Sequence, residues 1–145
     1  MLVDTNVISE LMRPRPNAKV QAWAERQESF DLSVVCVEEI LFGLRARPSS
    51  RLLSWFEEFV DHYCRVLPIS AAIARRSAEV RAELRARGKP RTQADMLIAA
   101  TAFEHGVALV TRNVKDTRPS GAFVFDPWND DAANFPLSPR AGAAR

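Results

Sequence analysis

The feature that most constrains the fold of this chain is the alternation of short apolar runs with longer segments of helical periodicity. The short runs lie at residues 2–3, 31–35, 65–69, 107–111 and 123–125. Between them, apolar residues recur at the i, i+3, i+4, i+7 spacing that is typical of amphipathic helices. Strands separated by helices need crossover connections, which place helices on both faces of a mostly parallel sheet. We therefore predict an α/β fold, a three-layer α/β/α sandwich with a mostly parallel central sheet.

Capping residues, prolines and glycines set the expected limits of the helices. Helices are predicted over residues 5–12, 17–28, 37–44, 52–63, 71–87 and 92–105. Pro14 and Pro16 end the first of them, and Gly88 and Gly106 end the last two. From Asn129 onward the chain has little to bury. The sequence therefore predicts one domain over residues 1–128 and a loose C-terminal tail over residues 129–145.

Composition excludes several classes of protein. Hydrophobic residues make up 47% of the 145 residues and charged residues 26%, as in ordinary soluble domains. No run approaches the roughly 18 apolar residues that a membrane span needs. The start carries a charge at Asp4 and lacks the basic and apolar regions of a signal peptide, so we expect a cytoplasmic protein. Two cysteines do not make a disulfide framework, and two histidines do not make a histidine-rich metal site.

Carboxylates lie where predicted strands end and where the following helices begin. These acids are Asp4, Glu38, Glu39, Asp95 and Asp116. Because the carboxyl ends of parallel strands share one rim, we expect the acids to meet there. Crowded carboxylates repel one another unless a cation lies between them, and oxygen ligands suit Mg²⁺ or Mn²⁺. Such an ion can activate water and stabilise charge on a phosphodiester.

Each acid also has a simpler interpretation. Asp95 stands three residues after Thr92, which is the spacing of a helix-capping pair. It is nevertheless in step with the apolar positions 98, 99 and 102, where an acid that only caps has little reason to point. The other acids can be turn, loop or solvent-facing residues. Periodicity does not decide between Glu38 and Glu39.

A basic segment precedes Asp95. Residues 75–91 contain seven basic side chains and two acidic ones, a net charge of +5, whereas the whole chain carries only +2. The basic residues are Arg75, Arg76, Arg81, Arg85, Arg87, Lys89 and Arg91. One interpretation is a solvated helix face. The other is a phosphate-binding surface beside the metal site, which would make binding strongly salt-dependent.

Four segments match the motifs of one family, in order. They lie at residues 2–11, 33–43, 88–102 and 109–116. Over residues 1–128 the chain resembles PIN-domain ribonucleases, and more closely the FitB-like toxins of VapBC-type toxin–antitoxin modules. The resemblance implies a PIN-like fold and assigns the catalytic and metal-binding roles to Asp4, Glu39, Asp95 and Asp116. It also selects Glu39 over Glu38.

Further residues take roles by the same resemblance. Thr5, Thr111 and Asn113 match polar positions that would orient the carboxylates. Lys89 and Arg91 are expected to bind RNA because they belong to the basic segment beside Asp95, and this expectation does not come from the resemblance. Thr117 stands where the family usually has an aromatic residue, so Asp116 is the least firmly placed of the four acids.

The function implied by the resemblance is that of a type II toxin. It would be a Mg²⁺- or Mn²⁺-dependent endoribonuclease in which a metal-activated water cleaves RNA, and related toxins often cut tRNA. Its partners would be a VapB-like antitoxin, operator DNA reached through the antitoxin complex, and a second copy in a homodimer. Either the dimer surface or the core would then hold the aromatic set Trp23, Trp55, Phe56, Phe59 and Tyr63.

Three alternative functions make different demands on the sequence. A haloacid-dehalogenase-type phosphatase needs a second aspartate two residues after the first, where Asn6 stands. A catalytically weak PIN domain that only binds its antitoxin and DNA complex would lack acids that are all present here. A DNA-directed nuclease is chemically close, and the sequence leaves the choice between RNA and DNA open.

Overall fold

A five-stranded parallel sheet forms the centre of the fold. The computed structural model describes residues 1–131, 133 and 135. The strands are β1 (Leu2–Val3), β2 (Phe30–Ser33), β3 (Cys64–Leu67), β4 (Leu109–Val110) and β5 (Val124–Phe125). Their order is β3-β2-β1-β4-β5, and every neighbouring pair is parallel. The predicted α/β fold with a parallel sheet is confirmed.

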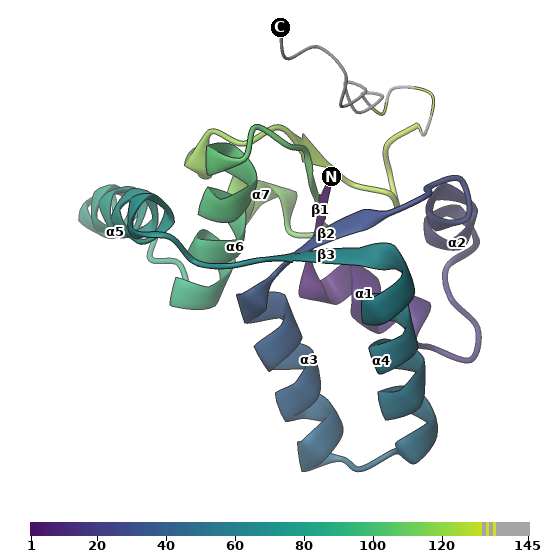
Figure 1. Ribbon diagram of the computed structural model, residues 1–145. Coiled ribbons are helices and arrows are strands. Elements are labelled where there is room, and N and C mark those ends of the chain that lie inside the picture. Colours follow the sequence, from purple (N-terminus) through teal and green to yellow (C-terminus); the bar gives the residue numbers. More distant parts are fainter. Residues whose placement is uncertain (132, 134, 136–145) are drawn as a thin grey trace, which may run out of the picture.

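Seven α-helices and one 3₁₀ helix connect the strands (Figure 1). They are α1 (Thr5–Leu11), α2 (Ala18–Ala24), α3 (Val34–Ala46), α4 (Ser50–Tyr63), α5 (Ala71–Ala86), α6 (Gln93–Glu104), α7 (Val114–Thr117) and η1 (Arg118–Ser120). In Figure 1, α3 and α4 form a hairpin below the sheet, and α5 and α6 lie on its left. This arrangement follows from the crossover connections that parallel strands require.

The strand order contains one reversal, which decides where a ligand can bind. From β1 the chain builds the sheet outward through β2 to β3, and then returns to add β4 and β5 on the other side of β1. The reversal therefore lies between β1 and β4. In open parallel sheets, ligands bind beyond the carboxyl ends of the strands at such a reversal. Asp4 and Thr111 are the residues that directly follow these two strands.

Several element limits differ from the sequence-based prediction; helix α3, for example, covers residues 34–46 rather than 37–44. Helix α2 ends at Ala24 rather than at residue 28, because the backbone turns into i→i−3 hydrogen bonds and the Gln27 amide donates to the Trp23 carbonyl. The predicted strand 31–35 ends at Ser33, whose hydroxyl caps α3. Residues 114–117, predicted as loop, form the short helix α7 and carry Asp116.

The predicted aromatic set divides between core and surface. Trp23 and Phe56 are buried in the core, whereas Tyr63 is 53% exposed. Trp55 and Phe59 are partly buried and stack on each other on α4, with ring centroids 5.1 Å apart. The core interpretation is therefore confirmed for Trp23 and Phe56, whereas Trp55 and Phe59 pack at the edge of the core and Tyr63 is exposed.

The predicted loose tail lies mostly outside the described residues. Phe135, which is described, is only 9% exposed and packs edge-on against Phe125, with ring centroids 4.7 Å apart. It also contacts Trp23. Phe135 therefore adds to the aromatic core, while the prediction for the tail as a whole stays a prediction. Among the described residues, no helix is both long and apolar enough to cross a membrane.

Candidate functional site

Asp4 is the central acid of the candidate site. It ends β1, caps the N-terminus of α1, and is only 4% exposed. Its backbone N–H donates to the Val110 carbonyl, which fixes Asp4 beside β4. Its carboxylate accepts hydrogen bonds from the Thr5 N–H at 2.7 Å, the Asn6 amide at 2.7 Å and the Thr111 hydroxyl at 2.5 Å. The carboxylate is therefore held at the strand reversal by groups from both β1 and β4.

The surroundings of Asp4 oppose its ionisation. Burial raises its pKa from 3.8 to about 6, although the hydrogen bonds from Thr111 and Thr5 act in the opposite direction. The negative charges of Asp95 and Glu39 contribute to this rise. These two acids therefore lie close enough to Asp4 for their charges to act on it, which brings three of the four predicted acids to one rim.

Glu39 reaches the site through Thr5. The Thr5 hydroxyl donates to a Glu39 carboxylate oxygen at 2.6 Å, while the Thr5 N–H donates to Asp4. Thr5 thus bridges two acids whose positions differ by 35 residues in the chain. Glu38, the neighbouring acid on α3, is exposed, whereas Glu39 is partly buried. The structure accordingly places Glu39, and not Glu38, beside Asp4.

Asp95 lies in the first turn of α6 beside its cap. The Thr92 hydroxyl accepts from the Asp95 N–H at 3.1 Å and donates to the Asp95 carboxylate at 2.6 Å. A reciprocal capping pair would instead have the Asp95 carboxylate accept from the Thr92 backbone N–H. Thr92 therefore caps the helix, and Asp95 keeps its carboxylate at the helix start, where the helix dipole favours negative charge.

Asp116 is placed differently from the other three acids. Its carboxylate forms an ion pair with the Arg91 guanidinium at 2.8 Å. The two side chains are 39% and 21% exposed, respectively. Arg91, predicted to bind RNA, is thus engaged with a predicted metal ligand, whereas Lys89 is exposed and makes no ion pair within the described part of the chain.

The polar residues around Asp4 include one that the sequence analysis missed. Thr111 is fully buried, and its oxygen also accepts from the Asn113 backbone N–H and the Asn6 amide, each at 2.9 Å. Asn113 thus contributes its backbone, and its side chain makes no capping bond at α7. Asn6 donates to both Asp4 and Thr111, and accepts from the Arg112 N–H. The sequence signal that could have identified Asn6 as a site residue is its position two residues after Asp4.

The carboxylates suit a hard cation by chemistry, although they do not form a closed cage. Within residues 1–131, 133 and 135, no three His, Cys, Asp or Glu side chains converge closely enough to hold a metal ion. The fit rests on charge: Asp4, Glu39 and Asp95 repel one another, and oxygen donors are the ligands that Mg²⁺ and Mn²⁺ prefer.

A groove runs from this rim along the helices of one face. It has a volume of about 450 Å³ and begins at Thr5 and Glu39. Apolar side chains form much of its lining, and two arginines also line it. The lining includes Met12, Arg13, Ile40, Leu44, Arg51 and Leu52. Of the four predicted acids, Glu39 lines this open groove, which lies between α1, α3 and α4.

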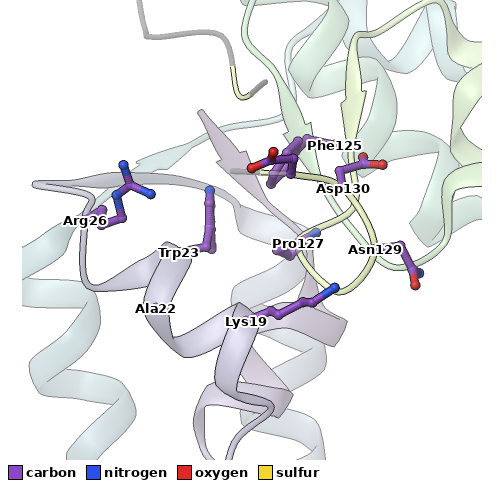
Figure 2. A pocket seen from close by; sticks show the side chains of 9 residues that line it. Lys19, Ala22, Trp23, Arg26, Phe125, Pro127, Asn129 and Asp130 are labelled. Atoms are coloured by element: carbon purple, nitrogen blue, oxygen red, sulfur yellow. The ribbon is translucent and has the colours of Figure 1, made fainter. Parts of the chain in front are cut away.

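A second pocket lies apart from the acids. Figure 2 shows it between α2 and the segment after β5, with Lys19 and Arg26 on one side and Asn129 and Asp130 on the other. Its volume is about 390 Å³, and none of the four predicted acids lines it. Trp23 and Phe125 form its apolar part. This pocket belongs to the aromatic core rather than to the candidate site.

Comparisons with known proteins agree with this arrangement. Residues 1–117 match the PIN domain family. The chain is 35% identical to a VapC ribonuclease, Y4jK, from Sinorhizobium fredii, over 88% of this chain and 97% of that protein. It is 33% identical to the toxin FitB from Neisseria gonorrhoeae, over 90% of this chain and 99% of that protein.

A solved structure has the same fold. It is FitAB bound to an IR36 DNA fragment, with a TM-score of 0.76 and 32% sequence identity. The match covers 90% of this chain and 96% of the other. The family match spans the four predicted acids, from Asp4 to Asp116. The chain belongs to the PIN-domain family, among relatives of the VapC and FitB type.

Proposed function

We propose that the chain is a Mg²⁺- or Mn²⁺-dependent endoribonuclease that acts as the toxin of a type II toxin–antitoxin module. The observation that carries this proposal is the buried Asp4 carboxylate at the strand reversal, with the charges of Asp95 and Glu39 acting on it. Three neighbouring carboxylates repel one another and so lower the stability of the fold unless a bound cation neutralises their charge. The ribonuclease name of the Sinorhizobium fredii relative supports the choice of substrate class.

The residues of the candidate site would divide the work of this reaction among them. Asp4, Glu39 and Asp95 would hold the cation, which supplies an activated water and neutralises charge on the phosphodiester. Thr5 keeps Asp4 and Glu39 in one arrangement, and Thr111 keeps Asp4 hydrogen-bonded in its ionised form. Asn6 ties Asp4 to Thr111. The groove from Glu39 along α3 would receive the RNA strand or a segment of the partner.

The proposed partners are a small antitoxin and a second copy of the chain. The gonococcal relative occurs in a FitAB complex with DNA. We propose that this chain likewise reaches operator DNA only through a VapB-like antitoxin, whose C-terminal segment would lie across the rim that holds Asp4, Glu39 and Asp95. The outer face of α4, with Tyr63 exposed, offers aromatic surface to the homodimer.

The experiment that tests the function is cleavage by the purified chain without antitoxin. Labelled tRNA and a DNA of the same sequence are incubated with Mg²⁺ or Mn²⁺, and the Asp95→Asn and Glu38→Gln variants are compared with the natural chain. We expect RNA cleavage that EDTA and Asp95→Asn abolish and that Glu38→Gln preserves, because Glu38 faces solvent. Preferential DNA cleavage would favour a DNA-directed nuclease. Antitoxin binding without cleavage of either substrate would favour a binding module.

A further inference from the structure

Arg91 is held more firmly than a surface arginine. Its guanidinium donates to the Pro90 carbonyl at 3.0 Å and to the Lys89 carbonyl at 3.3 Å, and pairs with Asp116 at 2.8 Å. Only 21% of its side chain is exposed. Exposed Arg–carboxylate pairs usually contribute little because both side chains must be ordered for one contact. Here the two carbonyls already order the guanidinium, so Asp116 meets a pre-positioned positive charge.

The ion pair brings together segments on either side of β4. Arg91 stands in the turn before α6, four residues ahead of Asp95, and Asp116 lies on α7, after β4. Helices α6 and α7 pack against each other. A positive charge is therefore fixed next to the start of α6, at the same end of the helix as Asp95.

This position changes what Asp116 can do. A carboxylate that faces a guanidinium at 2.8 Å has its charge compensated, and a divalent cation brought to it would be repelled by that guanidinium. Moving Arg91 away would also leave the half-exposed Asp116 carboxylate without its partner.

We propose that Asp116 anchors Arg91 instead of binding the cation, and that Arg91 provides a fixed positive charge where a second cation would otherwise be held. The inference rests on the proposed function. The cation is held by three acids, namely Asp4, Glu39 and Asp95. Arg91 is a positioning residue whose charge favours the approach of the scissile phosphate, and Asp116 acts through Arg91.

Mn²⁺ binding to the purified chain tests this assignment without any measurement of activity. Isothermal titration, checked by the electron paramagnetic resonance of free Mn²⁺, gives the affinity and the number of ions per chain. We expect one ion for the natural chain. Asp4→Asn and Asp95→Asn should weaken binding at least about tenfold, since even groups that only orient ligands cost that much. Asp116→Asn should change the Mn²⁺ affinity by less than about threefold, because this substitution does not remove a ligand of the ion.

Removal of Arg91 should instead increase the number of Mn²⁺ ions that the chain binds. Arg91→Met frees Asp116, and we expect it to bind a second Mn²⁺ ion, which the double variant Arg91→Met/Asp116→Asn loses again. Arg91→Lys keeps the charge and should bind one ion. Lys89→Met is the matched control, because it removes an equal charge two residues away and leaves the ion pair intact. Circular dichroism of each variant verifies that it is folded.

The outcomes separate the two proposals. If Asp116→Asn weakens Mn²⁺ binding as strongly as Asp95→Asn does, Asp116 is a ligand, and this inference fails while the proposed function stands. If Lys89→Met also gains a second ion, net charge rather than the ion pair is responsible, and the inference fails. If neither Asp4→Asn nor Asp95→Asn affects Mn²⁺ binding, the proposed cation site itself is wrong, and the inference falls with it.

Discussion

The Thr111 hydroxyl donates a hydrogen bond to the Asp4 carboxylate across the β1–β4 strand pair, at 2.5 Å. The two residues are 107 positions apart in the sequence, and they meet at the single reversal in strand order. Thr111 is fully buried, so no water can replace its hydroxyl. This bond links the geometry of the sheet to the ionisation of the central acid.

Replacing Thr111 by Val tests that link. Valine keeps the branched shape but removes the donor that lowers the Asp4 pKa, so this pKa should rise above about 6. Because a cation competes with the proton for Asp4, the pH midpoint of RNA cleavage should shift upward by about one unit. Cleavage rates between pH 5 and 9 measure the shift.

The control for this change is Thr101→Val. Thr101 is also fully buried, but its hydroxyl donates to the Leu97 carbonyl within α6. It should leave the pH midpoint where it is. An equal shift in both variants would show that loss of a buried hydroxyl, and not of the Asp4 contact, causes the effect.

The raised pKa of Asp4 also makes a prediction for stability. In the metal-free chain, folded Asp4 holds its proton up to about pH 6, whereas the unfolded residue loses it near 3.8. The folded state therefore binds more protons between these values, and Asp4's contribution to the free energy of unfolding falls as pH rises through that window. The full loss amounts to at most about 3 kcal/mol. At neutral pH in EDTA, Asp4→Asn should be more stable than the natural chain.

Urea unfolding in EDTA at pH 4, 5, 6 and 7 measures this effect as the difference between the two chains. The difference removes the contribution of all other titrating groups. It should grow in favour of Asp4→Asn as pH rises, and Mn²⁺ should then stabilise only the natural chain. A difference that stays constant with pH would contradict the assigned origin of the pKa shift.

The sequence was sufficient to predict where three acids would meet. Helical and apolar periodicity specified the parallel sheet, and the shared rim of parallel strands follows from that fold alone. The position of Asp4 at the strand end and of Asp95 at a helix start then needed no long-range information. Thr5 was expected to orient carboxylates, and it bonds both Asp4 and Glu39.

Other parts of the site depend on contacts that local pattern does not encode. Arg91 looked like one more member of a basic segment, and only the packing of α7 on α6 brings Asp116 to it. Helix α7 has four residues, which is too short for a periodic signal. Asn6 is polar in a helix start, where capping is the usual explanation, and its bond to Thr111 requires the β1–β4 pairing.

Arg76 illustrates how the basic segment divides by function. Its guanidinium donates to the Ser120 carbonyl at 2.7 Å and lies 4.1 Å from the centre of the Phe103 ring. Arg76→Met should therefore lower the free energy of unfolding by about 1–2 kcal/mol, because a hydrogen bond and a cation–π contact are lost. Mn²⁺ affinity should not change. A thermal or urea unfolding curve with unchanged stability would place Arg76 among the solvated charges instead.

Lys89 is an exposed member of the segment that makes no ion pair within the described residues. It is exposed beside Arg91, and Asp95 lies six residues further along the chain. Each phosphate contact adds about 0.7 to the slope of log affinity against log salt for a single strand. Lys89→Ala should therefore weaken RNA binding and reduce that slope by about 0.7. Fluorescence anisotropy of a labelled RNA in Ca²⁺, between 50 and 300 mM salt, measures both quantities.

The control for this change is Arg26→Ala. Arg26 is also an exposed cation, but it lies at the pocket shown in Figure 2, which none of the four predicted acids lines. If both variants lower the slope alike, RNA responds to the overall charge of the protein, and the basic surface beside the acids has no special part in binding.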